Sequence, residues 1–559
     1  MFNLKKVVNK IINYSYNRKY GIKNYPEEFK YIITHCKKNR VNLDQKFKKS
    51  VFSKKENIKL ASKYIKKNSK NFWKSSRFID NEDAGYIHRW SWALNLISTK
   101  KNKKNKYISS VINDWFFNYQ DAEYDNNKIE WYPYNISERI SNYVLLCELK
   151  IINNNKSYMN HLTSQMYFLS KNIEFYKGKK SNHALNNARA IFLLSCLSEN
   201  KIFKIFSINL ILYLCKKFMD KDGFFKFGSS HYQFIFTKWL VEIYYFGKKY
   251  KVKKIVTLKK YLYNSIQACN FFIQKNNYGK LTYPLFGNIS PDFTPEFLLN
   301  YLKTRSKKDN LSINSKNYNK KINGNKEWIK LKNNFQTIIF RNPLINGFDF
   351  NHAHSDFFHF VNFYKGNPIF VDIGRKDYLT NNLDYTLAQA HNSIMINKSG
   401  IFDGFIRENF FTKIGIYELN KENYTVIHKK NKIKFKALLS DKSMITRTFE
   451  LKNKAIIIEN EFKNMSQKNR IDIPLFIDNK IKIRKIDKTN ILLSSKLFKS
   501  ALSIKGENAS PKIEIFNRKQ HYKFSQCRSY GQTENLNLIN LSFFGKDYFK
   551  TTLKLNFLD

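Results

Sequence analysis

The hydrophobic pattern of the chain changes its period once, between residues 306 and 335. Before this point, from about residue 108, apolar residues recur every three or four positions, as on one face of an α-helix. After it they alternate with polar residues, as on one face of a β-strand. A chain of 559 residues is also too long for a single core. The sequence therefore predicts an α+β multidomain protein, with a helical half followed by an antiparallel β-sandwich.

Residues 306–328 are rich in Lys, Asn and Ser and nearly free of apolar side chains. This composition is typical of a linker, and it gives the domain boundary. We expect a basic helical extension at 1–75, a domain of paired antiparallel helices at 76–305, the linker at 306–328, and the β-sandwich at 329–559.

The chain is strongly basic, with 99 Lys and Arg against 44 Asp and Glu and a formal charge of +55. Such an excess favours an acidic partner, namely nucleic acid, anionic lipid or an acidic polysaccharide. A global bias toward Lys, Asn and Ile explains it equally well. The six cysteines form no C-x-x-C pair and imply no disulfide framework. Neither an export signal nor a transmembrane segment is recognisable.

Residues 351–392 contain four of the eleven histidines, and the segment is predicted to form strands. On a strand, His352 and His354 would share one face because they are two residues apart. Asp372 ends the next apolar run, and His391 opens HNSIMI. Two imidazoles and a carboxylate on neighbouring strands suit Zn²⁺ or a similar cation. The alternative is that these histidines fill a hydrated sheet face.

Three motifs in this region, HAHSDFFHF, VDIG and AHNSIMIN, resemble in order the signature of the heparinase II/III family of polysaccharide lyases. Ser355 stands where the family usually has Ala, and DYTLAQ lacks the basic residue often found before A-H-N. The resemblance covers about residues 75–559. It implies an incomplete α/α toroid as the catalytic domain at 76–305, before the β-sandwich. It also implies a divalent cation such as Zn²⁺ on His354, Asp372 and His391, in a structural role.

Three loop-to-helix junctions resemble further family elements. WYPYNISER ends in Arg139, which could bind a carboxylate or lie on a helix surface. SNHALNNARA begins with Asn182 and His183, which could cap a helix, and the family has a catalytic Asn-His pair here. SSHYQ contains His231 and Tyr232, and Tyr232 matches the family's catalytic tyrosine. In a chain with 35 tyrosines, only the motif distinguishes Tyr232 from a structural residue.

The resemblance implies that these residues share the steps of β-elimination at a uronic acid. Asn182 with His183, or Arg139, would neutralise the C6 carboxylate. Tyr232 or His352 would remove the C5 proton, and Tyr232 would protonate the leaving O4. The substrate contacts implied by the resemblance are Arg139, His231, Arg375 and Tyr378.

The sequence thus predicts a polysaccharide lyase acting on a uronic-acid-containing glycan, such as a glycosaminoglycan or alginate, between its two domains. The alternative is a non-catalytic glycan-binding or assembly protein of surface polysaccharide production. Nucleic acid is a disfavoured partner, because the aromatic and basic residues form no recognisable binding motif. The family implies the periplasm, whereas the absence of a recognisable signal peptide keeps the cytoplasm open. No feature indicates an oligomeric state.

Overall fold

The computed structural model describes most of the chain after residue 80. The described residues are 26, 29, 57–59, 64–66, 73, 80–97, 104–175, 182–306, 327–342, 352–379, 384–401, 404–407, 410–413, 424–517 and 523–558. The predicted extension at 1–75 and the predicted linker at 306–328 therefore lie almost wholly outside them. In the extension, Asn57–Lys59 (β1) and Tyr64–Lys66 (β2) form an antiparallel pair.

The chain divides into two compact units that are interleaved in sequence. Unit 1 consists of Met1–Phe225, Ile235–Ile266 and Pro291–Ser312. Unit 2 consists of Lys226–Phe234, Gln267–Ser290 and Ile313–Asp559. The sequence predicted contiguous domains, whereas two segments from within the helical half are grouped with the β-rich half.

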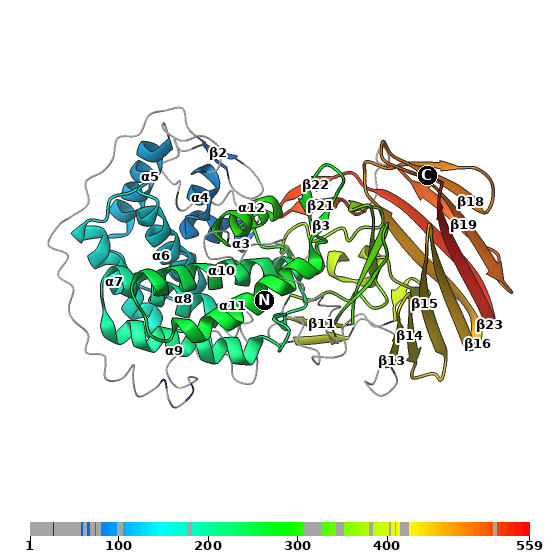
Figure 1. Cartoon of the computed structure of the whole chain (residues 1–559), viewed down its shortest axis with the longest axis horizontal. Coiled ribbons are helices and arrows are strands. Elements are labelled where there is room, and N and C mark those ends of the chain that lie inside the picture. The colour runs from blue at the N-terminus through cyan, green and yellow to red at the C-terminus, as the bar shows by residue number, and fades with distance from the viewer. Residues whose placement is uncertain are drawn as a thin grey trace, which may run out of the picture. The chain divides into compact units, whose positions relative to one another are not determined.

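Apart from β1 and β2, the described part of unit 1 is mainly helical, and Figure 1 shows its helices in blue to green. The helices are α3 (Asn81–Arg89), α4 (Ser91–Ile97), α5 (Lys104–Tyr119), α6 (Pro133–Glu148), α7 (Lys156–Lys171), α8 (His183–Leu197), α9 (Lys201–Phe218), α10 (Ser230–Lys249), α11 (Ile255–Phe272) and α12 (Pro295–Ser306). Helices α10 and α11 each contribute residues to both units.

Local sequence signals explain where these helices begin. Pro133 occupies the first turn of α6, where its missing N–H costs nothing. Asn155 caps α7 by accepting from the Tyr158 backbone N–H, and Asn200 caps α9 in the same way. The helices then bury their apolar faces against one another, which supplies most of their stability.

A buried ionic network joins α6, α8 and α10. Arg189 of α8 donates to Glu138 of α6 at 2.8 Å and to Glu242 of α10 at 2.7 Å. Lys238 donates to Glu242 at 2.6 Å, and all four side chains are excluded from water. Removing one member would leave a buried charge uncompensated, which typically costs about 3–5 kcal/mol. The network therefore fixes the order of these three helices.

Unit 2 is built from antiparallel sheets. The largest has the strand order β13-β14-β15-β16-β23-β19-β18-β17, and a four-stranded sheet has the order β5-β6-β7-β8. The strands of the large sheet are β13 (Tyr424–Lys429), β14 (Lys432–Leu438), β15 (Met444–Lys452), β16 (Ala455–Ile477), β23 (Asn537–Phe557), β19 (Lys499–Glu507), β18 (Asn490–Ser494) and β17 (Lys482–Lys485), with β9 (Met395–Ile396), β10 (Ser399–Gly400) and β20 (Lys512–Phe516) beside them.

The small sheet consists of β5 (Trp328–Lys332), β6 (Gln336–Arg341), β7 (Phe360–Tyr364) and β8 (Asn367–Pro368). Three hairpins complete the unit: β3 (Gln274–Lys275) with β4 (Leu281–Thr282), β11 (Gly404–Arg407) with β12 (Phe410–Lys413), and β21 (Gln526–Ser529) with β22 (Gln532–Glu534). All of these pairings are antiparallel.

The small sheet and the large sheet share one core. Phe449 of the large sheet contacts Phe340 and Phe360 of the small sheet, with ring centroids 4.7 and 5.0 Å apart. Tyr364 stacks on Phe557 at 3.8 Å. Each sheet thus buries its apolar face against the other, which is the arrangement of a β-sandwich. A helical domain followed by an antiparallel β-sandwich is therefore confirmed.

The strand prediction for residues 351–392 is wrong in part. His352–His359 belong to no strand, and residues 369–373 make only an isolated bridge between Phe370 and Ile477. The backbone of the histidine segment bonds to other loops instead. The His352 carbonyl accepts from Asn288 N at 2.8 Å, and Ser355 N donates to the Thr386 carbonyl at 2.8 Å.

No helix in the described part of the chain combines the length and the apolar character needed to cross a bilayer. Of the three cysteines in apolar helical runs, Cys196 and Cys215 are buried and Cys147 is half-buried. All three are free thiols.

Candidate functional site

Loops of unit 2 bring the histidine segment against the start of α10. Gly287 has φ +72°, and a Cβ at this position would lie 2.3 Å from the His352 carbonyl oxygen. Only glycine therefore permits the close approach of the two loops. The next residue, Asn288, donates its backbone N–H to that carbonyl. Ser229, just before α10, donates its hydroxyl to the Asn288 carbonyl at 2.8 Å.

Tyr232 and His352 stack face to face. Their ring centroids are 3.7 Å apart with an interplanar angle of 14°, and each side chain is 7% exposed. Tyr232 lies in the first turn of α10, where its backbone N–H donates to Ser229 Oγ at 3.2 Å. The two predicted catalytic residues of this unit are thus brought into contact, although they are far apart in the sequence.

Asn288 connects this pair to the next polar side chains. Its Oδ1 accepts from Arg375 Nη1 at 2.7 Å and lies 3.0 Å from His354 Nε2. A guanidinium only donates, so Oδ1 is an acceptor and His354 carries its proton on Nε2. The Arg375 guanidinium lies 4.0 Å from the centre of the Tyr378 ring. Arg375 and Tyr378, both predicted as substrate contacts, therefore belong to the same group.

A cluster of three buried side chains follows behind His354. Ligand atoms of His359, Asp372 and His391 all lie within 4.8 Å of one another and could hold a metal ion. Asp372 Oδ2 is 3.1 Å from His359 Nε2 and 3.3 Å from His391 Nδ1. Burial alone would raise the pKa of Asp372, but the two imidazoles hold it well below its ordinary value. Asp372 is therefore a carboxylate, the form that binds cations.

The hydrogen bonds of each histidine decide which nitrogen has a lone pair. The Asn392 backbone N–H donates to His359 Nδ1 at 2.9 Å. A neutral imidazole has one donor and one acceptor nitrogen, so the proton of His359 is on Nε2, the atom that faces Asp372. His359 therefore presents an N–H to the carboxylate, 3.1 Å from Asp372 Oδ2. Burial lowers the pKa of His359, which favours this neutral form.

His354 has the opposite arrangement. Its proton is on Nε2 and bonds to Asn288, so Nδ1 keeps the lone pair, and this buried atom has no hydrogen-bond partner within the described ranges. The His354 and His391 ring centroids are 5.2 Å apart. If distances alone decide, the third possible metal ligand beside Asp372 and His391 is His359. The hydrogen bonds instead favour His354 in that role, because a ligand nitrogen needs a free lone pair.

In unit 1, Asn182 directly precedes α8, but its side chain makes no capping bond. Its Nδ2 is buried and lacks a partner among the described residues, so capping does not explain the residue. The neighbouring His183 places Nδ1 2.9 Å from Glu174 Oε1, and its ring centroid lies 4.6 Å from that of Tyr134. The side chain of His183 is 35% exposed.

Arg139 is in a different environment from the expected one. It is fully buried, and its Nε and Nη2 donate to Gln165 Oε1 at 3.0 and 2.8 Å. Its Nη1 donates to the carbonyls of His88 and Glu130. The guanidinium also packs 4.3 Å from the centre of the Trp115 ring. Burial lowers the pKa of Arg139 to about 9. These contacts assign Arg139 to the packing of the helical core.

His231 is fully buried as well, with Nδ1 2.9 Å from the Tyr283 hydroxyl. The motif that identifies Tyr232 thus provides a core residue beside the candidate catalytic one. Two residues in contact with predicted site residues, Asn288 and His359, were not themselves predicted as site residues. The Gly-Asn pair at 287–288 was a signal for Asn288, because a glycine before a polar residue in a loop permits close backbone approach.

The described architecture has known counterparts among solved structures. The chain is similar to a crystal structure of heparinase III, with a TM-score of 0.64, 14% identity, and coverage of 86% of this chain and 78% of that chain. It is also similar to a mutant of the heparan sulfate lyase HepC from Pedobacter heparinus, with a TM-score of 0.56, 15% identity, and coverage of 95% and 83%.

A third similar structure is a heparinase III gene product, with a TM-score of 0.57, 13% identity, and coverage of 87% of this chain and 80% of that chain. No protein-family model and no curated protein matches the sequence. The likeness establishes the fold, that of the heparinase structures. The predicted fold class, an incomplete α/α toroid followed by an antiparallel β-sandwich, is confirmed.

Proposed function

We propose that the protein is a polysaccharide lyase that cleaves a uronic-acid-containing glycan by β-elimination. The observation that carries this proposal is the stacked pair of Tyr232 and His352, 3.7 Å apart. The pair joins a phenol and an imidazole, the two types of group that general acid–base chemistry at this reaction requires. The solved proteins with this fold include a heparan sulfate lyase, which agrees with such a substrate.

β-Elimination moves one proton off C5 and one onto O4. The electron pair of the C5–H bond becomes the C4=C5 double bond, and the C4–O4 bond breaks with its electrons on oxygen. His352 or Tyr232 accepts the C5 proton, and the Tyr232 hydroxyl donates to O4. Because the two rings are in contact, one sugar residue can meet both groups.

The C5 proton becomes acidic only when the neighbouring carboxylate is neutralised. Asn182 suits this role, because its buried Nδ2 is a donor that no described residue uses. We assign His183 to the same role, because it begins the helix that follows Asn182 and its side chain is partly exposed. In unit 2, Arg375 donates to Asn288 and carries a positive charge there, and its guanidinium packs on the ring of Tyr378. We assign both residues to substrate binding.

We also propose that His354, Asp372 and His391 hold one divalent cation such as Zn²⁺. The lone pair on His354 Nδ1 and the ionised carboxylate of Asp372 fit this donor set, and His359 orients the carboxylate. When bound, the ion would supply positive charge and a fixed link between the loops. The proton transfers need only Tyr232 and His352, so the link is structural.

The experiment is a screen of the purified protein against heparan sulfate, alginate, hyaluronan and glucuronan. The new C4=C5 double bond conjugated to the carboxylate absorbs ultraviolet light, so turnover is read directly. We expect absorbance to rise with one of these glycans and to stay flat in Tyr232→Phe. Binding of an acidic glycan with no double bond from any of them would refute the lyase and favour a glycan-binding or assembly protein.

A further inference from the structure

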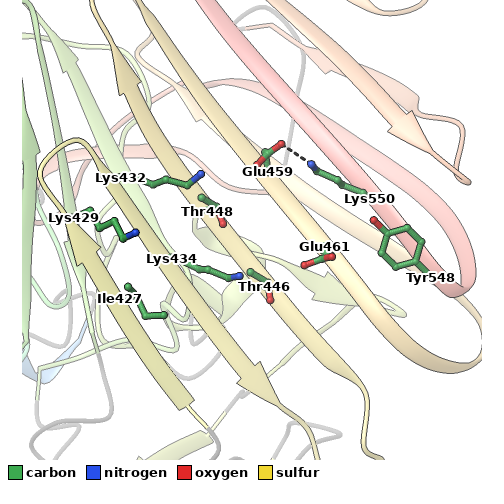
Figure 2. A pocket seen from close by; sticks show the side chains of 10 residues that line it. All are labelled: Ile427, Lys429, Lys432, Lys434, Thr446, Thr448, Glu459, Glu461, Tyr548 and Lys550. Carbon is green, nitrogen blue, oxygen red and sulfur yellow. Dashed lines mark ion pairs between the residues drawn. The ribbon is translucent and has the colours of Figure 1, made fainter.

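The outer face of the large sheet contains a groove that the proposed reaction does not use. Its cavity volume is about 380 Å³, which lies in the range of about 300–1,000 Å³ common for small-ligand sites. Figure 2 shows its lining side chains on strands β13 to β16 and on β23. The lining residues are Ile427, Lys429, Lys432, Lys434, Thr446, Thr448, Glu459, Glu461, Tyr548 and Lys550.

The strand register explains why these side chains share one face. Lys434 pairs with Thr448, and Thr448 pairs with Glu459, so the three form one row across β14, β15 and β16. The residues between them along the strands, such as Phe435 and Phe449, belong to the sandwich core. Since side chains alternate across a strand, the polar set points outward.

The charges in the groove are unevenly balanced. Both carboxylates already have a partner: Glu459 pairs with Lys550 at 2.6 Å, and Glu461 pairs with Lys463 at 2.9 Å. Lys429 and Lys434, in contrast, make no ion pair with any carboxylate in the described part of the chain. The side of the groove on β13 and β14 therefore presents uncompensated positive charge.

Hydroxyl groups lie beside these ammonium groups. Thr446 and Thr448 are 4% and 7% exposed, and neither hydroxyl bonds to a described residue. Figure 2 shows the lysines of β14 directed toward these threonines, with the half-buried Tyr548 at the other side. A compositional bias would spread lysines over any exposed face. It does not account for two recessed hydroxyls beside the lysines of β14 in one hollow, where Lys432 pairs with Glu450 at 3.7 Å and Lys434 pairs with no carboxylate of the described residues.

We propose that this groove binds a segment of anionic polysaccharide. Carboxylate or sulfate groups of the chain would bind Lys429 and Lys434, and sugar hydroxyls would bond to Thr446 and Thr448. This inference rests on the proposed function, because it assigns the acidic substrate a second contact surface. None of the groove residues belongs to the Tyr232–His352 group, so the groove increases retention of a long chain without taking part in its cleavage.

The test is a double substitution with a matched control. Lys429→Gln with Lys434→Gln removes the two unpaired charges. Lys482→Gln with Lys485→Gln removes two charges from β17, at the opposite end of the strand order. Binding to immobilised heparan sulfate and alginate is measured at 0.1 M salt on the full chain. Two exposed contacts, each changing affinity about 1.5- to 5-fold, predict a loss of about 2- to 25-fold for the groove variant alone.

Thr448→Val, which keeps the side-chain volume, should weaken binding in the same direction. Melting temperatures of all variants establish that the fold is intact. An equal loss in the groove and control variants would overturn the proposal, as would no loss in either. So would a parent protein that binds neither glycan, or an equal loss of binding to duplex DNA.

Cleavage separates this proposal from the previous one. If the parent generates the double bond, the groove variant should raise KM for the polymer and leave kcat on a tetrasaccharide unchanged. If the parent generates no double bond, the lyase fails. The binding comparison then still decides whether the groove holds an acidic glycan.

Discussion

Substituting His354 and His359 separately by glutamine should distinguish a metal ligand from its hydrogen-bonding neighbour. Both histidines are buried in the same cluster, and each change is His→Gln. The glutamine amide reaches about as far as Nε2 of the histidine. In His359→Gln, the amide N–H can still face Asp372, as Nε2 does now at 3.1 Å. In His354→Gln, the amide can still bond to Asn288, but no atom replaces Nδ1.

The expected magnitudes differ because the two residues have different roles. Structural zinc sites bind with about 10–16 kcal/mol, which is about 2.5–4 kcal/mol for each of about four ligands. Losing the His354 ligand should therefore weaken metal binding by about 70- to 900-fold. Losing a residue that only contacts a metal ligand, such as His359, typically lowers metal affinity about 10- to 100-fold. The loss is smaller where the substituted side chain keeps an N–H that faces the ligand.

The assay is metal content by elemental analysis after dialysis, with the melting temperature measured with and without a chelator. We expect about one equivalent of metal in the parent and in His359→Gln, and none in His354→Gln. The chelator should lower the melting temperature of the first two proteins only, since a ligand bound by the folded state stabilises it. Metal retained in His354→Gln and lost in His359→Gln would refute the assignment from hydrogen bonds. A metal-free parent that is unaffected by chelator would refute the site.

Three further outcomes are expected. Tyr232→Phe should lower turnover about 10²- to 10⁴-fold with little change in glycan affinity, whereas Tyr143→Phe, at another buried tyrosine, should not; equal turnover in both variants would make Tyr232 structural. Asn182→Ala should lower kcat/KM about 10²- to 10³-fold and Asn182→Asp further, since it repels the uronate; an active Asn182→Asp would remove the residue from catalysis. Burial lowers the pKa of Lys330 in the folded protein to about 7 from its ordinary 10.5. Between these two pH values the unfolded chain binds one proton more than the folded protein, so the free energy of unfolding rises with pH. Lys330→Met should lose about 1 kcal/mol of that rise per pH unit between pH 7.5 and 9 in urea unfolding, and an unchanged slope would show that Lys330 stays protonated.

The spacing of apolar residues predicted the fold, because a helix or strand that buries one face must carry apolar residues at the period of that element. KIKFKAL alternates polar and apolar residues and forms β14, Lys432–Leu438, in which every second side chain is buried. A strand was also predicted for His352–His359, because aromatic residues follow HAHSD, and this prediction failed. The backbone of the segment instead bonds to other loops, through the His352 carbonyl with Asn288 N and through Ser355 N with the Thr386 carbonyl. Local propensity cannot anticipate such contacts, because the partners come from distant segments such as the loop of Asn288.

The family motifs named two residues that lie in contact and misjudged the environment of two others. Tyr232 and His352 were paired only through a family resemblance, and the structure brings them into contact. Arg139 and His231 came from the same kind of motif, yet both are core residues. The local sequence does not distinguish an arginine that faces a ligand from one that packs on Trp115, as Arg139 does. That distinction depends on which side of a helix is covered, and the covering residues lie elsewhere in the chain.

The histidine cluster shows what sequence spacing leaves undetermined in a metal site. His354 and His359 both lie near His391, with ring centroids 5.2 and 5.1 Å from it. Proximity therefore does not choose between them, and neither does residue type. The two histidines differ in their hydrogen bonds to neutral groups. The Asn392 backbone N–H donates to Nδ1 of His359, and Nε2 of His354 bonds to the side-chain oxygen of Asn288. Since a neutral imidazole has one lone pair, these bonds commit His359 to donating and leave His354 free to bind a cation.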